Sequence, residues 1–255
     1  MLIDSHAHLH DRKFDRDREK VIKNLKRDGI EKVINIGTSI RASKQAIDLA
    51  EKYDNIYATV GINCGGEEEY PTIPQLRPLL KSKKVVAIGE IGLDYHHYPD
   101  EKEIQKKCFR KQIDLANEFN LPIVVHDRKA NQDTFDIIKG EKEKNEKLRG
   151  VIHCYSGDLN LAKEYVKLGF YISIAGPVTY RSAKKLKDVA AEIPLDNLFI
   201  ETDAPYLSPG QIGRKRNEPA YVRYVAGAIA DLKGIPFQLV ERKTANNIKR
   251  LFNIT

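Results

Sequence analysis

The sequence predicts an α/β fold, a (β/α)₈ TIM barrel. Eight short runs of β-branched and apolar residues recur along the chain, and a longer segment with helical spacing follows each run. Strands that alternate with helices pair in parallel through crossover connections, and eight such units in 255 residues match the usual size of this barrel. A doubly wound sheet usually has about five or six strands, so the barrel is favoured.

The predicted strands are short and evenly spread. They cover residues 2–3, 33–36, 56–60, 85–88, 123–125, 151–152, 171–174 and 198–200. Residues 21–25 have the spacing of an amphipathic helix that ends at Gly29, and residues 161–168 repeat this pattern up to Gly169. The Lys- and Glu-rich stretch 139–149 is typical of a solvated helix end and loop. No flexible linker interrupts this alternation, so we expect one domain over residues 1–255.

Composition and charge exclude several classes of protein. The chain is 41% hydrophobic and 31% charged, which excludes a disordered or collagen-like protein. Cys64, Cys108 and Cys154 are odd in number and far apart, so they predict neither a disulfide framework nor a zinc ribbon. The net charge of +7 is compatible with a polyanionic partner but is too small to establish one.

Location and assembly are predicted from what the sequence lacks. No apolar run approaches the roughly 18 residues of a membrane span, and the first residues have neither the basic nor the apolar region of an export signal. We therefore expect a cytoplasmic protein with no membrane partner. No apolar helix face is evident either, so we expect a monomer.

Polar residues gather at the ends of the predicted strands. In a barrel these positions converge on one mouth, where active sites are built. The residues found there are His6, His8, Asn63, Glu90, His126, His153 and Asp203. All of them except Asn63 are of metal-ligand type, and four of the chain's seven histidines are among them.

Each of these residues also has a purely structural interpretation. Two histidines two positions apart are often two satisfied polar side chains, and a histidine that ends an apolar run is often a hydrogen-bonded core residue. A glutamate flanked by glycines can mark a tight turn, and an aspartate before Ala-Pro can cap one. Their common placement at one mouth favours a metal site over these alternatives.

Seven ordered motifs cover essentially the whole chain. They are IDSHAHL at 3–9, AIGEIGLD at 87–94, LPIVVH at 121–126, HCYSG at 153–157, GPVTY at 176–180, ETDAP at 201–205 and GRKRNEP at 213–219. With these motifs the chain resembles the TatD-like metal-dependent deoxyribonucleases, a branch of the amidohydrolase superfamily. The resemblance implies a metal-dependent hydrolase built on a TIM barrel, acting on DNA and trimming single-stranded ends in the 3′ to 5′ direction.

The resemblance also implies two divalent metal ions and their ligands. One ion would be held by His6, His8 and Asp203, the other by His126 and His153, and Glu90 would bridge them. Imidazole and carboxylate ligands suit Zn²⁺ or Mn²⁺, and carboxylate-rich sites also accept Mg²⁺, so the metal stays open. Two such ions lower the pKa of a water between them and stabilise the entering and leaving oxygens at phosphorus.

Two residues receive a catalytic role at this stage. Asp203, beside the water, is the candidate general base. Glu90 is the bridging carboxylate, because the superfamily's alternative, a carboxylated lysine on the fourth strand, has no counterpart here. Lys84 is at the wrong end of that strand.

One motif departs from the family. After the third strand the chain has Asn63-Cys64-Gly65, where the family usually has His-Pro-His. Asn63 can donate a hydrogen bond to substrate but cannot carry charge or a proton. Cys64 is predicted to be a buried thiol rather than a soft ligand. The departure keeps open another ester substrate, such as a small phosphate ester, a lactone or D-aminoacyl-tRNA.

Other residues at the predicted mouth suit nucleic acid. Arg214 and Arg216, together with Arg128, are predicted to contact the phosphate of a DNA substrate, because guanidinium groups bind phosphate in a bidentate manner. The aromatic stretch 95–98 can stack a base, but packing against the barrel rim is favoured. A non-catalytic barrel that binds nucleic acid is the least favoured alternative, since binding alone does not need this set of ligands.

Overall fold

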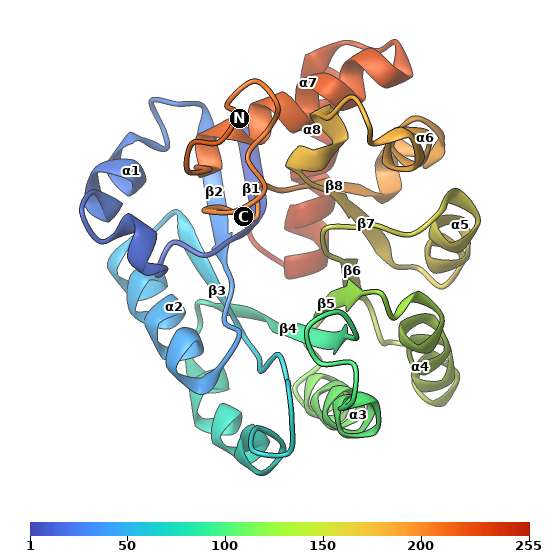
Figure 1. Cartoon of the computed structure of the whole chain (residues 1–255). Coiled ribbons are helices and arrows are strands. Elements are labelled where there is room, and N and C mark those ends of the chain that lie inside the picture. Colours follow the sequence, from blue (N-terminus) through green and yellow to red (C-terminus); the bar gives the residue numbers. More distant parts are fainter.

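A computed structural model describes residues 1–255 and confirms the predicted barrel. Eight parallel strands pair in chain order around a nearly closed barrel, and helices lie between them on the outside (Figure 1). The strands are β1 Leu2–Ala7, β2 Ile30–Asn35, β3 Ile56–Val60, β4 Val85–Asp94, β5 Ile123–Arg128, β6 Gly150–Ile152, β7 Tyr171–Ile174 and β8 Leu198–Ile200. Each predicted run overlaps one of them, although 33–36 ends one residue past β2, and β4 and β1 extend furthest beyond the prediction.

Helices follow most strands. The α-helices are α1 Arg18–Asn24, α2 Ile40–Lys52, α3 Lys102–Glu118, α4 Asn131–Lys144, α5 Leu159–Lys167, α6 Lys184–Glu192, α7 Val222–Lys233 and α8 Phe237–Phe252. The crossover after β3 is instead a 3₁₀ segment, Tyr70–Lys81, because Pro74 and Pro78 lie inside it and remove the amide donors of an α-helix. Shorter 3₁₀ turns cover Arg12–Phe14, Gly176–Thr179, Leu195–Asn197 and Pro219–Tyr221. No helix is long and apolar enough to cross a membrane.

The barrel closes where the end of β8 meets β1. Ala7 and Ala204 form a parallel bridge, and the Asp203 amide donates to the His6 carbonyl oxygen at 2.9 Å. Beneath this bridge, buried Asp4 accepts hydrogen bonds from the amide and the hydroxyl of Thr202, at 2.9 and 2.6 Å. The contacts tie together the two strand ends that carry predicted metal ligands.

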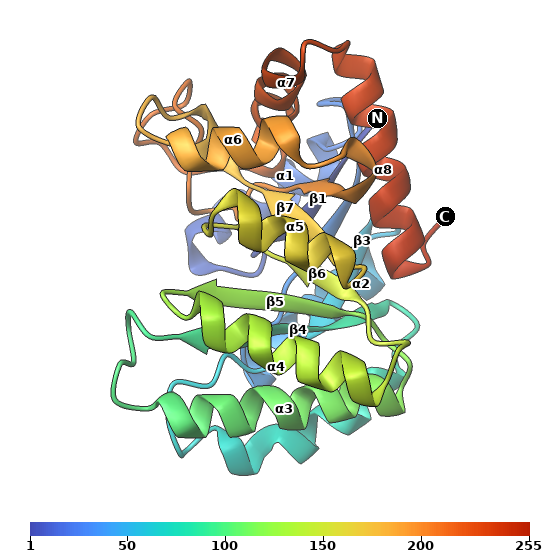
Figure 2. The same ribbon diagram turned by 90° about the vertical axis from the view of Figure 1, so that its right-hand side faces the viewer.

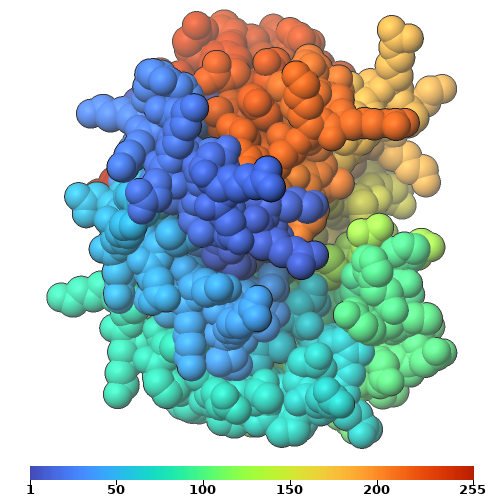
Figure 3. All heavy atoms as spheres, turned by 60° about the vertical axis from the view of Figure 1, so that its left-hand side comes forward, coloured from blue at the N-terminus to red at the C-terminus, as the bar shows by residue number.

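The loop after β8 also lies against the first βα loop. The two segments meet on one face of the molecule, where blue and orange atoms adjoin (Figure 3). Tyr206 donates its hydroxyl hydrogen to Asp11 at 2.7 Å, and the ammonium of Lys13 lies 4.4 Å from the centre of the Tyr206 ring. The barrel mouth is thus bordered on this side by two interlocked loops.

The strands separate two apolar layers. Outward residues pack against the helices, whereas inward residues at the start of the strands form a cluster with α8. In Figure 2, α8 runs across the end of the barrel opposite to the arrowheads of β4 and β5. Val124, Val151 and Phe199 contribute to this inner cluster, which α8 closes with Leu251 and Phe252. The strand ends that carry function are therefore at the open end.

The prediction about cysteines was wrong in one respect. The structure pairs Cys64 with Cys108 in a disulfide, with their Cα atoms 6.4 Å apart, while Cys154 is free. Both paired cysteines are buried. Their separation of 44 residues along the chain hid this contact, because the loop after β3 folds onto α3. Gln112 of α3 reinforces it by hydrogen bonding both the amide and the carbonyl of Ile62, each at 2.8 Å.

Candidate metal centre

The alternation of strand residues aims the predicted ligands into the mouth. Side chains two positions apart on a strand share a face, so His126 follows the inward Val124, and His153 just past β6 follows the inward Val151. Glu90 lies within β4 rather than after it, in a stretch where the pairing with β5 shifts register between Ile88 and Ile91.

Glycines bring the neighbouring strands close to this stretch. A Cβ atom on Gly89 would come within 2.6 Å of the Val124 side chain, and one on Gly61 would meet the backbone of Gly89 at the same distance. The glycines beside Glu90 therefore serve strand packing, and the tight turn considered for them is absent.

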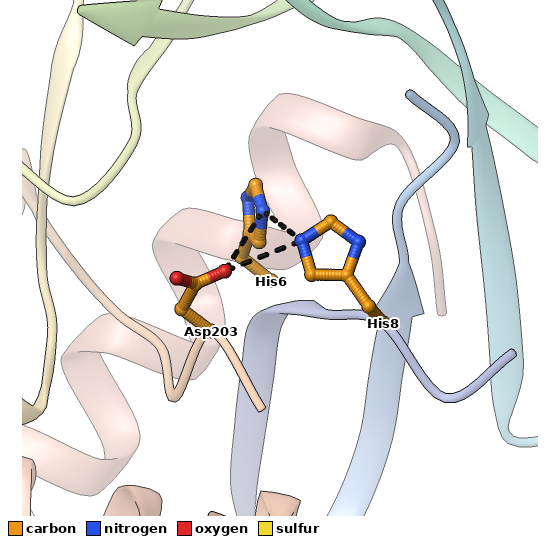
Figure 4. Close-up of side chains that lie close together, drawn as sticks. All are labelled: His6, His8 and Asp203. Carbon is orange, nitrogen blue, oxygen red and sulfur yellow. Dashed lines mark hydrogen bonds and ion pairs between the residues drawn. The ribbon is translucent and has the colours of Figure 1, made fainter. Parts of the chain in front are cut away.

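Three of the predicted ligands form one compact group (Figure 4). The Nε2 atoms of His6 and His8 are 3.3 Å apart. Asp203 Oδ1 lies 3.6 Å from His6 Nε2 and 3.2 Å from His8 Nε2. Both histidines are buried. One nitrogen from each histidine and one carboxylate oxygen thus face a common point.

Glu90 lies between this group and the other two histidines. Its Oε2 is 3.2 Å from His6 Nε2 and 3.9 Å from His8 Nε2. Its Oε1 faces the opposite way, 2.6 Å from His126 Nδ1 and 3.9 Å from His153 Nε2. Each oxygen of the carboxylate therefore faces its own pair of imidazole nitrogens, which is the arrangement that a bridging ligand needs.

The donor set fits divalent cations. Imidazole nitrogens and carboxylate oxygens are the usual ligands of zinc and of neighbouring first-row ions. His126 Nδ1 is buried and lies 2.6 Å from Glu90 Oε1. A buried carboxylate needs a positively charged partner, and here the imidazoles supply it. A cation between Glu90 and these nitrogens would meet the same need.

The electrostatics of the site favour positive charge. Burial opposes charge on His126 and His153, but neighbouring carboxylates outweigh it and raise the pKa of His126 to about 10 and that of His153 to about 9. Burial also opposes ionisation of Glu90, yet His153 and His126 hold its pKa well below the usual value. Burial also opposes ionisation of Asp203, but other contacts, mainly a hydrogen bond from His8, outweigh it and lower the pKa of Asp203.

Two carboxylates that were not predicted as site residues lie behind the histidines. Glu201 accepts a hydrogen bond from His153 Nδ1 at 2.8 Å, and Asp94 accepts one from His126 Nε2 at 3.1 Å. Both are buried. Asp94 and Glu201 belong to the GLD and ETD segments of the motifs. Their contacts join residues that are 32 and 48 positions apart in the sequence, so no local pattern reveals them.

The predicted substrate contacts have different surroundings. Arg128 and Arg214 are exposed, and Asn63 is half-buried on the loop after β3. Arg216 is engaged with protein groups: its guanidinium donates to both Asp17 oxygens, at 2.6 and 2.7 Å, and to Glu218 at 2.8 Å. These contacts hold the loop after β8 against α1, and the phosphate contact predicted for Arg216 is not supported.

Two further expectations concern the aromatic stretch 95–98 and Lys84. Tyr95 donates its hydroxyl hydrogen to Asp133 at 2.6 Å, so this residue packs at the rim as favoured. The Tyr98 ring covers Gly65, although the side chain is 47% exposed. Lys84 lies at the end of β4 remote from the mouth, where its ammonium donates to the carbonyls of Asp54 and Ile56. It is thus far from any bridging position.

Comparison with known proteins agrees with this architecture. Residues 3–253 match the family model described as TatD related DNase. An uncharacterized metal-dependent hydrolase of Bacillus subtilis, YabD, is 44% identical over the whole of both chains. A protein of Enterobacter lignolyticus named 3′-5′ ssDNA/RNA exonuclease TatD is 31% identical, with 99% of each chain covered. The crystal structure of YjjV, a TatD homologue from Escherichia coli, covers 100% of this chain and 98% of its own, with a TM-score of 0.92 and 31% identity.

Proposed function

Because the chain belongs to the TatD-related DNase family of metal-dependent hydrolases, we propose that it hydrolyses DNA phosphodiester bonds with two divalent cations. We further propose that it acts as a 3′-5′ exonuclease on single-stranded ends. The name of the Enterobacter lignolyticus relative supports this choice of substrate. The observation that carries the proposal is Glu90, whose two oxygens face opposite pairs of imidazole nitrogens.

The residues divide into two ligand groups. His6, His8 and Asp203 would hold one cation, His126 and His153 the other, and Glu90 would be shared. When bound, Mg²⁺, Mn²⁺ or Zn²⁺ supplies Lewis acid stabilisation of the phosphoryl oxygens and a water of lowered pKa. The lowered pKa of Asp203 keeps this carboxylate ionised at neutral pH, as a general base must be to accept the proton of the attacking water.

Exposed basic side chains supply the substrate contacts. Arg128, at the end of β5, and Arg214, in the loop after β8, carry guanidinium groups that can pair with phosphate. Arg214 has no ion pair or hydrogen bond to another protein group through its side chain. Contacts of this kind attract any DNA strand, and they position the backbone without reading its sequence.

Another ester remains the second candidate substrate. The observation that favours it is Asn63, which lies where the family usually has the first histidine of His-Pro-His. Its neighbour Cys64 is joined to Cys108, so the loop is fixed to α3 without an imidazole. The amide of Asn63 can donate a hydrogen bond to a substrate oxygen, but it carries no charge and cannot transfer a proton. The departure therefore keeps a small phosphate ester, a lactone or D-aminoacyl-tRNA open as substrate.

The test is nucleotide release from labelled single-stranded DNA. Protein stripped of metal and reloaded with Mg²⁺, Mn²⁺ or Zn²⁺ is expected to release nucleotides, and Asp203→Asn is expected to abolish release. Asp133→Asn, which changes a carboxylate at the rim that touches no ligand, serves as the control. Metal binding without nucleotide release would reject the DNA substrate and direct the assay to the ester panel. Release that persists in Asp203→Asn would reject the assigned base.

A further inference from the structure

We infer that Asp94 is a positioning residue, which fixes His126 with a proton on Nε2 and thereby leaves Nδ1 free for a cation. The inference rests on the metal centre proposed above. It assigns to Asp94 control over one of the two cation sites, the one that includes His126. Asp94 contacts the site through the His126 imidazole.

The two oxygens of Asp94 have separate tasks. Oδ1 accepts the backbone amides of His96 and His97, at 3.0 and 2.9 Å. Oδ2 accepts from two imidazoles, His126 Nε2 at 3.1 Å and His97 Nδ1 at 2.8 Å. One oxygen therefore caps the loop after β4, and the other holds the ring of a predicted ligand.

The backbone fixes Asp94 beside His126. Pairing of β4 with β5 continues past the register shift, so that Gly92 lies opposite His126 and Asp94 opposite Arg128. A Cβ atom on Gly92 would lie 2.0 Å from the His126 carbonyl oxygen, so only glycine permits this approach. Gln105 of α3 then holds the Asp94 backbone, accepting its amide at 2.7 Å and donating to its carbonyl at 3.3 Å.

The contact selects one tautomer of His126. A carboxylate accepts but does not donate, so Nε2 carries a hydrogen toward Asp94, and Nδ1 is the nitrogen that can exchange its proton for a cation. That nitrogen is the one that lies 2.6 Å from Glu90 Oε1, the carboxylate proposed to be shared by both cations. Partners of this kind orient metal-binding histidines, and their loss typically weakens metal binding by about 10- to 100-fold.

Replacing Asp94 with asparagine reverses the contact with His126 and also removes the one with His97. The asparagine oxygen can keep the two backbone amides that Oδ1 accepts, while its amide nitrogen takes the place of Oδ2. The nitrogen then presents hydrogen atoms to His126 Nε2, which favours the opposite tautomer and places a proton on Nδ1. An Asp to Asn change beside a catalytic histidine has this consequence in serine proteases.

Metal titration gives the first test. Zn²⁺ titrated into metal-free wild-type protein is expected to occupy two sites, and Asp94→Asn is expected to weaken one of them by about 10- to 100-fold while the other is unchanged. Asp133→Asn, a nearby rim carboxylate bonded to Tyr95 and Lys106, should leave both affinities unchanged. Equal affinities in Asp94→Asn and wild type would overturn the inference and leave the proposed hydrolase intact.

Nitrogen-15 NMR of the histidine side chains gives a second test, which does not depend on the folding of Asp94→Asn. In wild-type protein, with or without Zn²⁺, a downfield ring proton is expected on His126 Nε2, assigned by its loss in His126→Gln. A Zn²⁺-loaded protein whose His126 Nε2 lacks a proton would overturn the inference. Binding of fewer than two Zn²⁺ ions with the Nε2 proton in place would instead contradict the two-cation proposal and support the role of Asp94.

Discussion

The two ends of the barrel are built from the same strands but have opposite chemistry. At the closed end, inward residues such as Val124 and Phe199 pack with Leu251 and Phe252 of α8 in an apolar cluster. At the open end, the same inward face carries buried imidazoles and carboxylates, among them His6, whose Nδ1 has no hydrogen-bond partner. Burial of apolar groups stabilises the fold, whereas burial of unpaired polar groups opposes it.

The difference teaches where changes should affect function and where they should affect stability. Val124 and His126 are two residues apart on β5, yet one belongs to the apolar cluster and the other to the candidate metal centre. The free energy gained by apolar burial at the closed end thus offsets the free energy lost by burying polar and charged groups at the mouth. Variants at the open end should therefore change activity, and variants at the closed end should change the free energy of unfolding.

The largest effect is expected from Glu90→Gln. The amide retains one oxygen but places hydrogen atoms where the other oxygen was, so one of the two imidazole pairs loses its shared carboxylate. Hydrolysis is expected to fall by about 10³-fold or more. The bound metal per chain should fall as well, while the far-ultraviolet circular dichroism spectrum stays unchanged. Glu90→Gln protein with wild-type hydrolysis would show that the mouth does not act through this carboxylate.

The next effect belongs to the closed end. Phe199 is fully buried, with its ring centre 4.7 Å from that of Tyr171 and 5.9 Å from that of Phe252. Phe199→Ala is expected to lower the free energy of unfolding by about 3–5 kcal/mol, measured by urea denaturation. Activity per folded molecule should not change. Phe199→Leu, the milder control, should cost less, and a variant that lost activity without losing stability would contradict the separation of the two ends.

Much of this division could be predicted from the sequence. All eight strands were predicted, and the six candidate ligands were selected because they end apolar runs that face one mouth. What failed was contact between distant segments. Cys64 meets Cys108, and Arg216 meets Asp17 across 199 residues, because loops fold back over the barrel. Local patterns determine strands and helices, but they carry no signal for which loops touch.

Two arginines of one loop sharpen the comparison at the rim itself. Arg214 is exposed and unpaired, so Arg214→Met is expected to raise the KM for single-stranded DNA. It should also reduce the slope of the logarithm of the binding constant against the logarithm of salt concentration by about 0.7. Arg216 pairs with Asp17 and Glu218, so Arg216→Met should instead lower the free energy of unfolding by about 1 kcal/mol with little change in KM. Measured together by kinetics and urea denaturation, the two variants should change different quantities. A rise in KM for Arg216→Met alone would reverse the assignment.

The smallest effect is the pH dependence of that rim contact. The hydrogen bonds from Arg216 lower the pKa of Asp17 below its ordinary value of 3.8. Because the pKa is lower in the folded chain than in the unfolded one, the stabilisation is present above that ordinary value and is lost as pH falls through the folded value. The difference in unfolding free energy between wild type and Arg216→Met should therefore stay constant from about pH 7 to 5 and shrink below about pH 4. Arg214→Met, which breaks no ion pair, should show no such convergence, and a difference for Arg216→Met that persisted at low pH would show that its guanidinium acts through packing on Phe14 rather than through charge.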